Sequence, residues 1–323
     1  MPLPRRLFRE FAGVIRRNRT FFLSGHRNPD ADTVGSELAL ASLLKRLGKR
    51  VDIYNAEPPP RNLGFLAGIG RIRAARKVSR AYDAAVIFEC FDAGRMGNII
   101  DLETQAGTVV NVDHHRHHSN FGDLNLIDPL ASSNSEQLIG LFREMRLDIL
   151  PNEAAALYAG IMTDTGRFRH SNTNDRTLSA AAQLAARGAD PNLIWEKIDG
   201  TRRLPALRLL GRVLSVLEIS SKGRIAFAAL SRRDFKRCGA DDEDTEEIVN
   251  YGLEVPTVLV SILVREAAPG VVKASLRSRR GVDVCRLAQK FGGGGHKYAS
   301  GCKLETSLDR AGRLLLAAAR GIL

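Results

Sequence analysis

Hydrophobic residues in the first two-thirds of the chain form short apolar runs that alternate with stretches of helical spacing. The strand-like cores of the runs at 20–26, 84–90 and 107–115 are nearly all apolar, and the run at 84–90 includes β-branched and aromatic side chains, which predicts strands buried on both faces. The stretch at 35–49 repeats its apolar residues at intervals of three and four, as a helix does. Further strands are expected at 50–57 and 124–128. This alternation predicts an α/β fold with a doubly wound, mainly parallel sheet.

The pattern changes after residue 175. Helical spacing continues to about residue 218, and 204–219 reads as a connecting helix. Beyond it, strand-like runs follow one another with few helices between them, which predicts a smaller α+β domain. We therefore expect a first domain at 1–195, a helical linker at 196–218 and a second domain at 219–323.

Composition adds a constraint on the partners of the chain. Lys and Arg number 48 against 36 Asp and Glu, a net charge of +12 that often accompanies nucleic acids or nucleotides. The four cysteines follow no disulfide or zinc spacing, and no apolar stretch approaches the roughly 18 residues of a membrane span. We expect reduced thiols, no membrane partner and a cytoplasmic location.

Side chains that can bind metal ions follow the ends of the predicted strands. In an open α/β sheet, ligands gather at the carboxyl ends of the strands, so residues from separate segments meet there. The candidates are His26, Asp30 and Asp32 after the first strand, Glu89 and Asp92 after the third, Asp113, His114 and His115 after the fourth, and Asp164 within 158–170.

The chemistry of this set favours a metal site. Converging carboxylates repel one another unless cations lie between them, and mixed His and Asp ligands suit divalent first-row metals. A single aspartate after a strand is most often a helix N-cap. Caps leave the histidines unexplained, so the whole set predicts metal ions, and a pair of ions suits phosphoryl chemistry.

Four of the seven histidines lie within 114–118. His114 and His115 directly follow Asp113 and are expected in the centre. His117 and His118 lie beyond the motif, where we expect surface residues, with substrate contact as the alternative.

Together these motifs resemble the DHH phosphoesterase family. "HRNPDADTVGS" (26–36), "VDHH" (112–115) and "YAGIMTDTGRF" (158–168) are similar to three of its motifs in the order that the family uses. "FGGGGHKYASG" (291–301) is similar to the glycine-rich motif of its DHH-associated domain. The resemblance runs from about residue 20 to 305 and points to the oligoribonuclease branch, the nanoRNases, which also act as 3′-phosphoadenosine 5′-phosphate phosphatases.

The resemblance implies two manganese ions, with magnesium or cobalt as other options. His26 and Asp30 would bind one ion; Asp32, His114 and Asp164 would bind the other. A hydroxide held between the ions would attack phosphorus. Asp113 would orient His114, and His115 would reach the phosphate or assist proton transfer.

One position departs from the family pattern. The family usually has an aspartate directly after the third strand, as the ligand that bridges both ions. Here "VIFECFDAGRMG" has Glu89 at that point, and Asp92 three residues later. We expect Glu89 to bridge the ions, with Asp92 as the alternative if the strand ends later.

The second domain contains a run of four glycines, 292–295, whose role differs from that of the common nucleotide-binding loops. No Gly-Lys-Ser/Thr follows it, so it is no Walker A loop, and it follows a helical pattern instead of opening a helix. Glycines allow close approach, and consecutive N–H groups can form an anion nest. The alternative is a flexible turn. The residues expected to bind substrate are Asn28, Ser275, Arg277, Gly293, Gly294, Gly295 and His296.

These expectations lead to a function. The chain is expected to be a manganese-dependent phosphoesterase that releases 5′-mononucleotides from short RNA and converts 3′-phosphoadenosine 5′-phosphate to AMP. The rival enzymes are a polyphosphatase and a cyclic or linear dinucleotide phosphodiesterase, acting on c-di-AMP or pApA. The rivals without catalysis are a nucleotide sensor and a nucleic-acid-binding protein. The resemblance also points to a homodimer.

Overall fold

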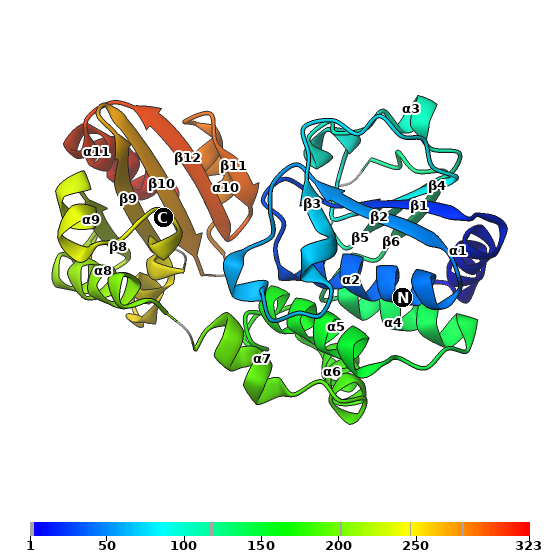
Figure 1. Ribbon diagram of the computed structural model, residues 1–323. Coiled ribbons are helices and arrows are strands. Elements are labelled where there is room, and N and C mark those ends of the chain that lie inside the picture. Colours follow the sequence, from blue (N-terminus) through cyan, green and yellow to red (C-terminus); the bar gives the residue numbers. More distant parts are fainter. Residues whose placement is uncertain (1–2, 116–118, 201, 246, 280) are drawn as a thin grey trace. The chain divides into compact units, whose positions relative to one another are not determined.

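The computed structural model describes residues 3–115, 119–200, 202–245, 247–279 and 281–323. The chain divides into two compact units, Met1–Thr201 and Arg202–Leu323, each with its own sheet and its own hydrophobic core (Figure 1). His117 and His118 lie outside the described residues.

The sheet of the first unit has six strands, all parallel, in the order β3-β2-β1-β4-β5-β6. The strands are β1 (Thr20–Ser24), β2 (Arg50–Asn55), β3 (Ile72–Ala74), β4 (Ala84–Phe88), β5 (Val109–Asp113) and β6 (Leu124–Ile127). The predicted parallel sheet is confirmed, apart from β3, whose three residues are too few to show a pattern. The chain order reverses between β1 and β4, which makes their carboxyl ends the switch point where such sheets bind ligands.

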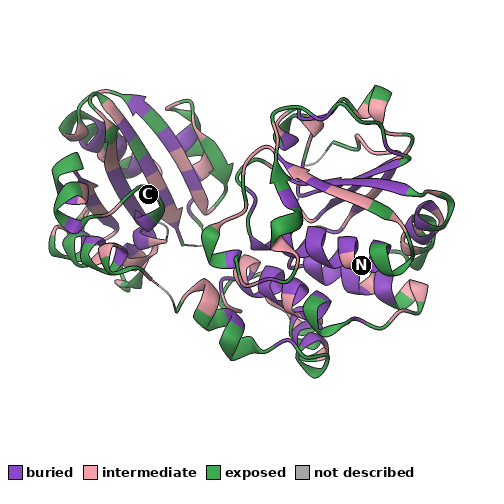
Figure 2. Cartoon of the chain, in the orientation of Figure 1, coloured by how far each residue is buried: buried purple, intermediate pink, exposed green. Residues whose placement is uncertain are grey.

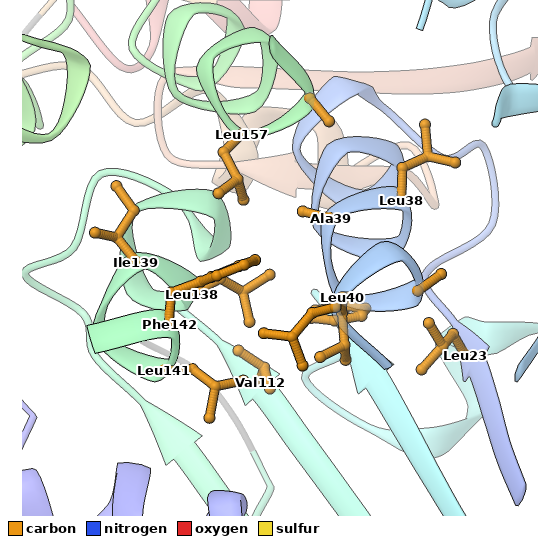
Figure 3. Close-up of a cluster of buried hydrophobic side chains, with 14 of the residues drawn as sticks. Leu23, Leu38, Ala39, Leu40, Val112, Leu138, Ile139, Leu141, Phe142 and Leu157 are labelled. Atoms are coloured by element: carbon orange, nitrogen blue, oxygen red, sulfur yellow. The ribbon is translucent and has the colours of Figure 1, made fainter. Parts of the chain in front are cut away.

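Helices cover one face of this sheet. They are α1 (Arg5–Arg17), α2 (Ala31–Arg46), α4 (Asn134–Met145), α5 (Pro151–Asp164), α6 (Asp175–Ala186) and α7 (Pro191–Ile198). Figure 3 shows Leu40 of α2, Phe142 of α4 and Leu157 of α5 converging with Val112 of the sheet. The other face is covered mainly by the connections at 75–83 and 89–107, which contain only the short α3 (Leu102–Gln105) and one 3-10 turn.

Two glycines let α2 and α5 cross closely. A Cβ on Gly35 would collide with the carbonyl oxygen of Ala156, and a Cβ on Gly160 would lie 2.8 Å from Oδ1 of Asp32. Any side chain at either position would push the helices apart. The close crossing therefore brings the first turn of α2 against α5, next to the predicted metal ligands.

The second unit contains a mixed sheet in the order β11-β12-β10-β9-β8-β7. The strands are β7 (Glu218–Ser220), β8 (Ile225–Leu230), β9 (Val260–Ala268), β10 (Val271–Ser278), β11 (Gly294–His296) and β12 (Ala299–Glu305). Only β8 and β9 pair in parallel among the pairs described. Alternating burial along β10, visible in Figure 2, separates the two faces.

Helices of the second unit pack on both faces of its sheet. Ile262 of β9 packs with α10 (Val284–Gln289) and α11 (Leu308–Arg320), whereas its neighbour Leu263 packs with α8 (Leu204–Ser215). The segment expected as a linker thus spans the end of α7 and all of α8, and α8 shares the core of the second unit with α9 (Arg232–Cys238). Among the described residues, no helix combines the length and apolar character needed to cross a membrane.

Candidate metal centre

The carboxyl ends of three neighbouring strands deliver the predicted ligands to one place. β1 pairs with β4, and β4 pairs with β5, all in parallel, so the residues that follow them lie side by side. His26 follows β1, Glu89 follows β4, and His114 follows β5. The order of β1, β4 and β5 therefore brings these three candidate ligands together at one edge of the sheet, as predicted.

Glu89 lies between two imidazoles. Its Oε2 is 3.3 Å from Nε2 of His26, and its Oε1 is 3.3 Å from Nε2 of His114. The carboxylate is 2% exposed, and Oε2 also accepts a hydrogen bond from the hydroxyl of Thr33. Glu89 thus presents one oxygen to each histidine from a buried position.

Two groups of ligand atoms share this carboxylate. His26, Asp30 and Glu89 form one group, and Asp32, Glu89 and His114 form the other; within each group the ligand atoms lie within 4.8 Å of one another. Asp30 also caps α2, accepting hydrogen bonds from the backbone N–H groups of Asp32 and Thr33. The cap fixes Asp32 in the first turn of α2, so one carboxylate positions the next.

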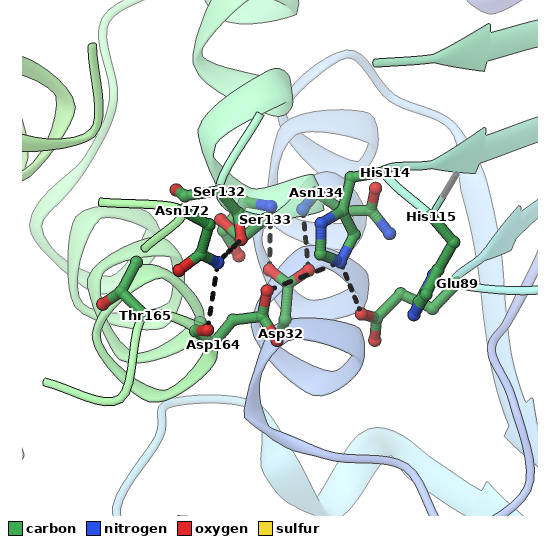
Figure 4. A network of polar contacts seen from close by, with 12 residues as sticks. Asp32, Glu89, His114, His115, Ser132, Ser133, Asn134, Asp164, Thr165 and Asn172 are labelled. Carbon is green, nitrogen blue, oxygen red and sulfur yellow. Dashed lines mark hydrogen bonds and ion pairs between the residues drawn. The ribbon is translucent and has the colours of Figure 1, made fainter. Parts of the chain in front are cut away.

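The N-terminus of α4 holds Asp32 from the opposite side (Figure 4). The backbone N–H groups of Asn134 and Ser135 donate to Oδ2 and Oδ1 of Asp32, at 2.7 and 2.8 Å. Ser133 caps this helix. The positive end of a helix dipole suits a buried carboxylate, so α4 stabilises Asp32 in its charged form.

Asp164 is the last residue of α5, and its Oδ2 lies 3.5 Å from Nε2 of His114. Gly166, Arg167 and Phe168 then turn the chain through left-handed φ angles of +55°, +61° and +62°. The chain returns with Asn172, whose amide donates to the backbone carbonyl of Asp164 at 3.2 Å (Figure 4). This return fixes the end of α5 beside the histidine.

Asp113 contacts a different ring from the one we expected. Its Oδ1 accepts a 2.7 Å hydrogen bond from Nδ1 of His115 and bonds from the backbone N–H groups of His114 and His115. Although burial favours the neutral acid, the bond with His115 holds the pKa of Asp113 below its usual value. The ionised Asp113 therefore orients His115, whereas we expected it to orient His114.

The pKa values in the centre follow from burial and pairing. Burial disfavours the charged form of Glu89, yet His114 and His26 hold its pKa well below the usual range. Burial by itself would lower the pKa of His26, but hydrogen bonds with Asp30 and Glu89 raise it to about 11. Burial and repulsion from Glu89 raise the pKa of Asp32 to about 7. Without added cations, the protonated imidazoles balance the carboxylates.

The donor set of this centre fits divalent cations. Carboxylate and imidazole ligands suit Mn²⁺ and other divalent first-row metals, and a carboxylate shared by two groups suits a pair of ions. Several carboxylates lie close together here, so metal charge would relieve their mutual repulsion. These residues can therefore hold a metal.

Two candidates of the first unit lie apart from these groups. Asp92 accepts a 3.1 Å hydrogen bond from the backbone N–H of Arg95 and caps the 3-10 turn Ala93–Met96. Asn28 is exposed, with a left-handed φ of +54°, and its backbone N–H donates to Glu57. In the structure, Asp92 thus serves as a cap, and Glu89 occupies the shared position.

The remaining candidates lie in the second unit, on or beside β10 and β11. Ser275 faces Gly301 of β12, and its hydroxyl accepts a 3.2 Å hydrogen bond from Arg265. Arg277 is two residues further along the same strand, so it shares the face of Ser275. His296 ends β11.

The glycine run forms a strand edge instead of a loose turn. Gly294 and Gly295 pair with β12. A Cβ on Gly293 would lie 2.7 Å from Cα of Cys302, and one on Gly295 would lie 2.7 Å from the carbonyl oxygen of Ala299. Gly295 also has a φ of +135°. Glycine is required at 293 and 295 because the backbone of β12 approaches closely.

The sequence did not reveal the residues that support the ligands. Asn55 ends β2, and its Oδ1 accepts from the backbone N–H of Gly25 at 3.0 Å, next to His26. Its amide group donates to the buried Glu37 at 3.0 Å. The sequence feature that could have indicated this role is an asparagine at the end of a predicted strand.

Both units of the chain match known proteins. The model of the DHH family, N-terminal domain, matches residues 20–161, and that of the DHHA1 domain matches residues 223–322. The chain is 32% identical, over 93% of its length and 89% of the relative's, to the "Bifunctional oligoribonuclease and PAP phosphatase NrnA" of Thermus thermophilus. The chain belongs to the DHH family. The family resemblance seen in the motifs is thereby confirmed.

Two further proteins that the chain resembles extend the comparison. An exopolyphosphatase-related protein from Bacteroides fragilis has a crystal structure with a TM-score of 0.93, at 26% identity, covering 98% of this chain and 96% of that one. The "Cyclic-di-AMP phosphodiesterase PdeA" of Listeria monocytogenes is 26% identical over 94% of this chain, but the match spans only 48% of that protein. The fold of both units is thus that of a DHH protein with a DHHA1 domain.

Proposed function

We propose that this chain hydrolyses phosphoester bonds of short oligoribonucleotides, releasing 5′-mononucleotides, and also converts 3′-phosphoadenosine 5′-phosphate to AMP. The observation that carries the proposal is the combination of near full-length similarity to a bifunctional oligoribonuclease and PAP phosphatase with the ligand groups around Glu89. The similarity supports the substrate class, and the ligand groups support the chemistry.

The proposed cofactor is a pair of Mn²⁺ ions. His26 and Asp30 would hold one ion, Asp32, His114 and Asp164 the other, and Glu89 would contact both. Bound there, the ions would supply Lewis acidity to the phosphate and to the attacking water. The protein contributes the positions of these ligands, fixed by the cap of Asp30 and by the N-terminus of α4.

His115 is the proposed proton donor to the leaving oxygen. The ionised Asp113 accepts from Nδ1, which directs the other ring nitrogen, Nε2, away from that carboxylate. His115 is partly exposed, at 23%, and its ring lies 4.8 Å from that of His114. The proposed donor is therefore oriented by its partner and reachable by a substrate.

On the second unit, the residues proposed to bind the nucleotide are Ser275, Arg277, Gly293, Gly294, Gly295 and His296. On the first unit, Asn28 is the residue proposed to bind substrate. An arginine fork suits phosphate. A nucleotide preference distinguishes this proposal from polyphosphate hydrolysis.

A panel of substrates tests the proposal. Purified protein with Mn²⁺ is given a dinucleotide RNA, a 20-nucleotide RNA, 3′-phosphoadenosine 5′-phosphate, and cyclic or linear di-adenylate. Fast turnover of the dinucleotide, abolished in the Glu89→Gln variant, is the expected result. Cyclic di-adenylate as the preferred substrate would instead favour a phosphodiesterase like the Listeria relative. Tight nucleotide binding with no turnover of any substrate would make the chain a sensor.

The choice of metal and the oligomeric state are proposals with their own measurements. Activity restored to metal-free protein more strongly by Mn²⁺ than by Mg²⁺ or Co²⁺ would support manganese. For the proposed homodimer, light scattering after size exclusion should give twice the mass of one chain, and the mass of one chain would contradict it.

A further inference from the structure

A solvent-facing pocket of about 350 Å³ lies on the first unit, away from the ligand groups. It is formed by β2, β3 and the connection that leads into β4, and its lining residues include Asp52, Arg73, Lys77 and Arg80. Its size falls within the range of small-ligand sites. We refer to it as the β2–β3 pocket.

The residues that line the β2–β3 pocket include no member of the ligand groups of the metal centre. Tyr82, which lines it, comes two residues before β4, whereas Glu89 directly follows the same strand. The five residues of β4 extend for roughly 16 Å. A ligand held between Asp52, Arg80 and Tyr82 would therefore be separate from one at the metal centre.

Two arginines of the pocket are held over aromatic rings. The guanidinium of Arg73 lies 5.1 Å from the ring centre of Tyr54 and donates to its hydroxyl at 2.9 Å. The guanidinium of Arg80 lies 5.4 Å from the ring centre of Tyr82. Stacking fixes the planes of these side chains, so they lose less freedom when they bind an anion.

Asp52 organises the centre of the pocket. Its Oδ2 accepts from the hydroxyl of Tyr82 at 2.9 Å and from Arg80 at 3.2 Å, and its Oδ1 lies 3.5 Å from Arg73. Burial and this bond raise the pKa of Tyr82, so its hydroxyl remains a donor. Asp52 thus contacts the guanidinium groups of both Arg73 and Arg80 and restricts their positions.

The pocket keeps a surplus of positive charge. Arg73, Lys77 and Arg80 face one carboxylate, Asp52, which leaves two uncompensated charges among the lining residues. The side chains of Arg73 and Arg80 are 60% and 51% exposed, and each guanidinium has five N–H donors, most of them outside the bonds to Asp52 and Tyr54. Charge and donors together match a phosphate group, which carries nearly two negative charges at neutral pH.

We propose that the β2–β3 pocket binds the phosphate of a nucleotide at a place separate from the metal centre. Two sources offer a phosphate to these donors: a free mononucleotide, whose terminal phosphate carries nearly two negative charges, and a longer RNA, whose internal phosphodiesters carry one each. The proposal does not depend on the reaction proposed above, because binding in the pocket can be measured without turnover.

Site-specific protection tests the proposal on the unmodified chain. Metal-free protein is treated with the arginine reagent phenylglyoxal, alone and with inorganic phosphate, AMP or a 12-nucleotide RNA, and modified arginines are located by mass spectrometry. At ten times its Kd, a ligand should slow modification of Arg73 and Arg80 about ten-fold. Arg76, exposed on the same segment and outside the pocket lining, is the internal control.

The outcomes separate the sources. Protection by inorganic phosphate and AMP identifies a site for free nucleotides, and protection by RNA alone identifies a site for a longer chain. No protection by any of them, or equal protection of Arg76, overturns the proposal, because the arginines would then serve Asp52 alone or respond to diffuse charge.

A pair of variants gives a second measurement. Lys77→Gln/Arg80→Gln should weaken binding of the protecting ligand at least ten-fold, whereas Arg71→Gln/Arg76→Gln, with the same loss of charge on the same segment, should change it less than about two-fold. Hydrolysis of a dinucleotide should stay unchanged in both. Equal weakening in the two variants would contradict a specific pocket.

Discussion

At the scale of single residues, Glu89 has a strained backbone conformation and a side chain that lies between His26 and His114. Its backbone has a left-handed φ of +55°, which costs a residue with a side chain about 1–3 kcal/mol. Its N–H still pairs with the carbonyl of Val112 on β5, at 3.1 Å. The turn directs the carboxylate between His26 and His114, so the strain is maintained by the contacts of the site.

This placement predicts different results for the two acidic residues of the segment. Glu89→Gln should lower kcat at least ~10³-fold, because it removes the negative charge between the two ligand groups. Asp92→Asn keeps the oxygen that caps the 3-10 turn, so kcat should fall less than ~3-fold. Steady-state assays with a dinucleotide measure both. The opposite order of effects would make Asp92 the bridging ligand.

Glu37 predicts a dependence of stability on pH. Its side chain is fully buried in α2, and Oε1 has no hydrogen-bond partner among the described residues. Burial raises its pKa from 4.5 to about 8. A raised pKa means that the folded state binds the proton more tightly, so this contribution to stability is complete below pH 4.5. It is lost as the pH rises through about 8, at about 1.4 kcal/mol per unit.

Glu37→Gln removes this titration. In metal-free protein, the free energy of unfolding of the variant should equal that of the wild type near pH 4.5. At pH 9 it should be higher than that of the wild type by a few kcal/mol. Urea unfolding across this range measures the difference. Glu10→Gln, at an exposed glutamate, is the control. Parallel pH curves for wild type and Glu37→Gln would contradict the raised pKa.

At the scale of elements, the crossing of α2 and α5 depends on Gly35. Gly35→Ala gains helix propensity but forces the new Cβ into the carbonyl of Ala156, and overpacking of this kind costs about 1–3 kcal/mol. Gly211→Ala lies on the exposed face of α8, where a Cβ meets nothing within 4 Å, and should gain about 0.5–1 kcal/mol. Calorimetry of both variants measures the two effects, and stabilisation by Gly35→Ala would contradict the close crossing.

The elements show where sequence patterns suffice and where they fail. β1, β4 and β5 were predictable because strands of a parallel sheet are buried on both faces and therefore continuously apolar. β3 was not, since only Ile72 of its three residues is buried. α8 has helical spacing, but spacing does not tell which core a helix joins.

The same division applies to the site. The candidates His26 and Asp32 were predictable because both belong to the segment that comes after the apolar strand β1. The support for Asp32 was not, since the backbone N–H groups of Asn134 and Ser135 leave no mark in the sequence. The pairing of Asp113 with His115 instead of His114 depends on rotamers, which the motif does not specify.

At the scale of the whole molecule, the net charge of +12 predicts a dependence on salt. Positive charge speeds the capture of an anionic substrate, and ions screen it. Raising KCl from about 50 to about 300 mM should raise KM for a dinucleotide severalfold and leave kcat nearly constant. Glucose at equal osmolarity is the control. A fall in kcat with constant KM would indicate an effect on the centre itself.

Strand pairing also governs how such a protein can change over generations. The segments with His26, Glu89 and His114 each follow their own strand, and the hydrogen bonds between β1, β4 and β5 set the distances between these three segments. These distances do not depend on how many residues separate the motifs along the sequence. Insertions at exposed positions of the connection between β2 and β3 can therefore accumulate at little cost in stability without moving His26 relative to Glu89. Motif spacing along the sequence is free to drift while the geometry of the centre persists.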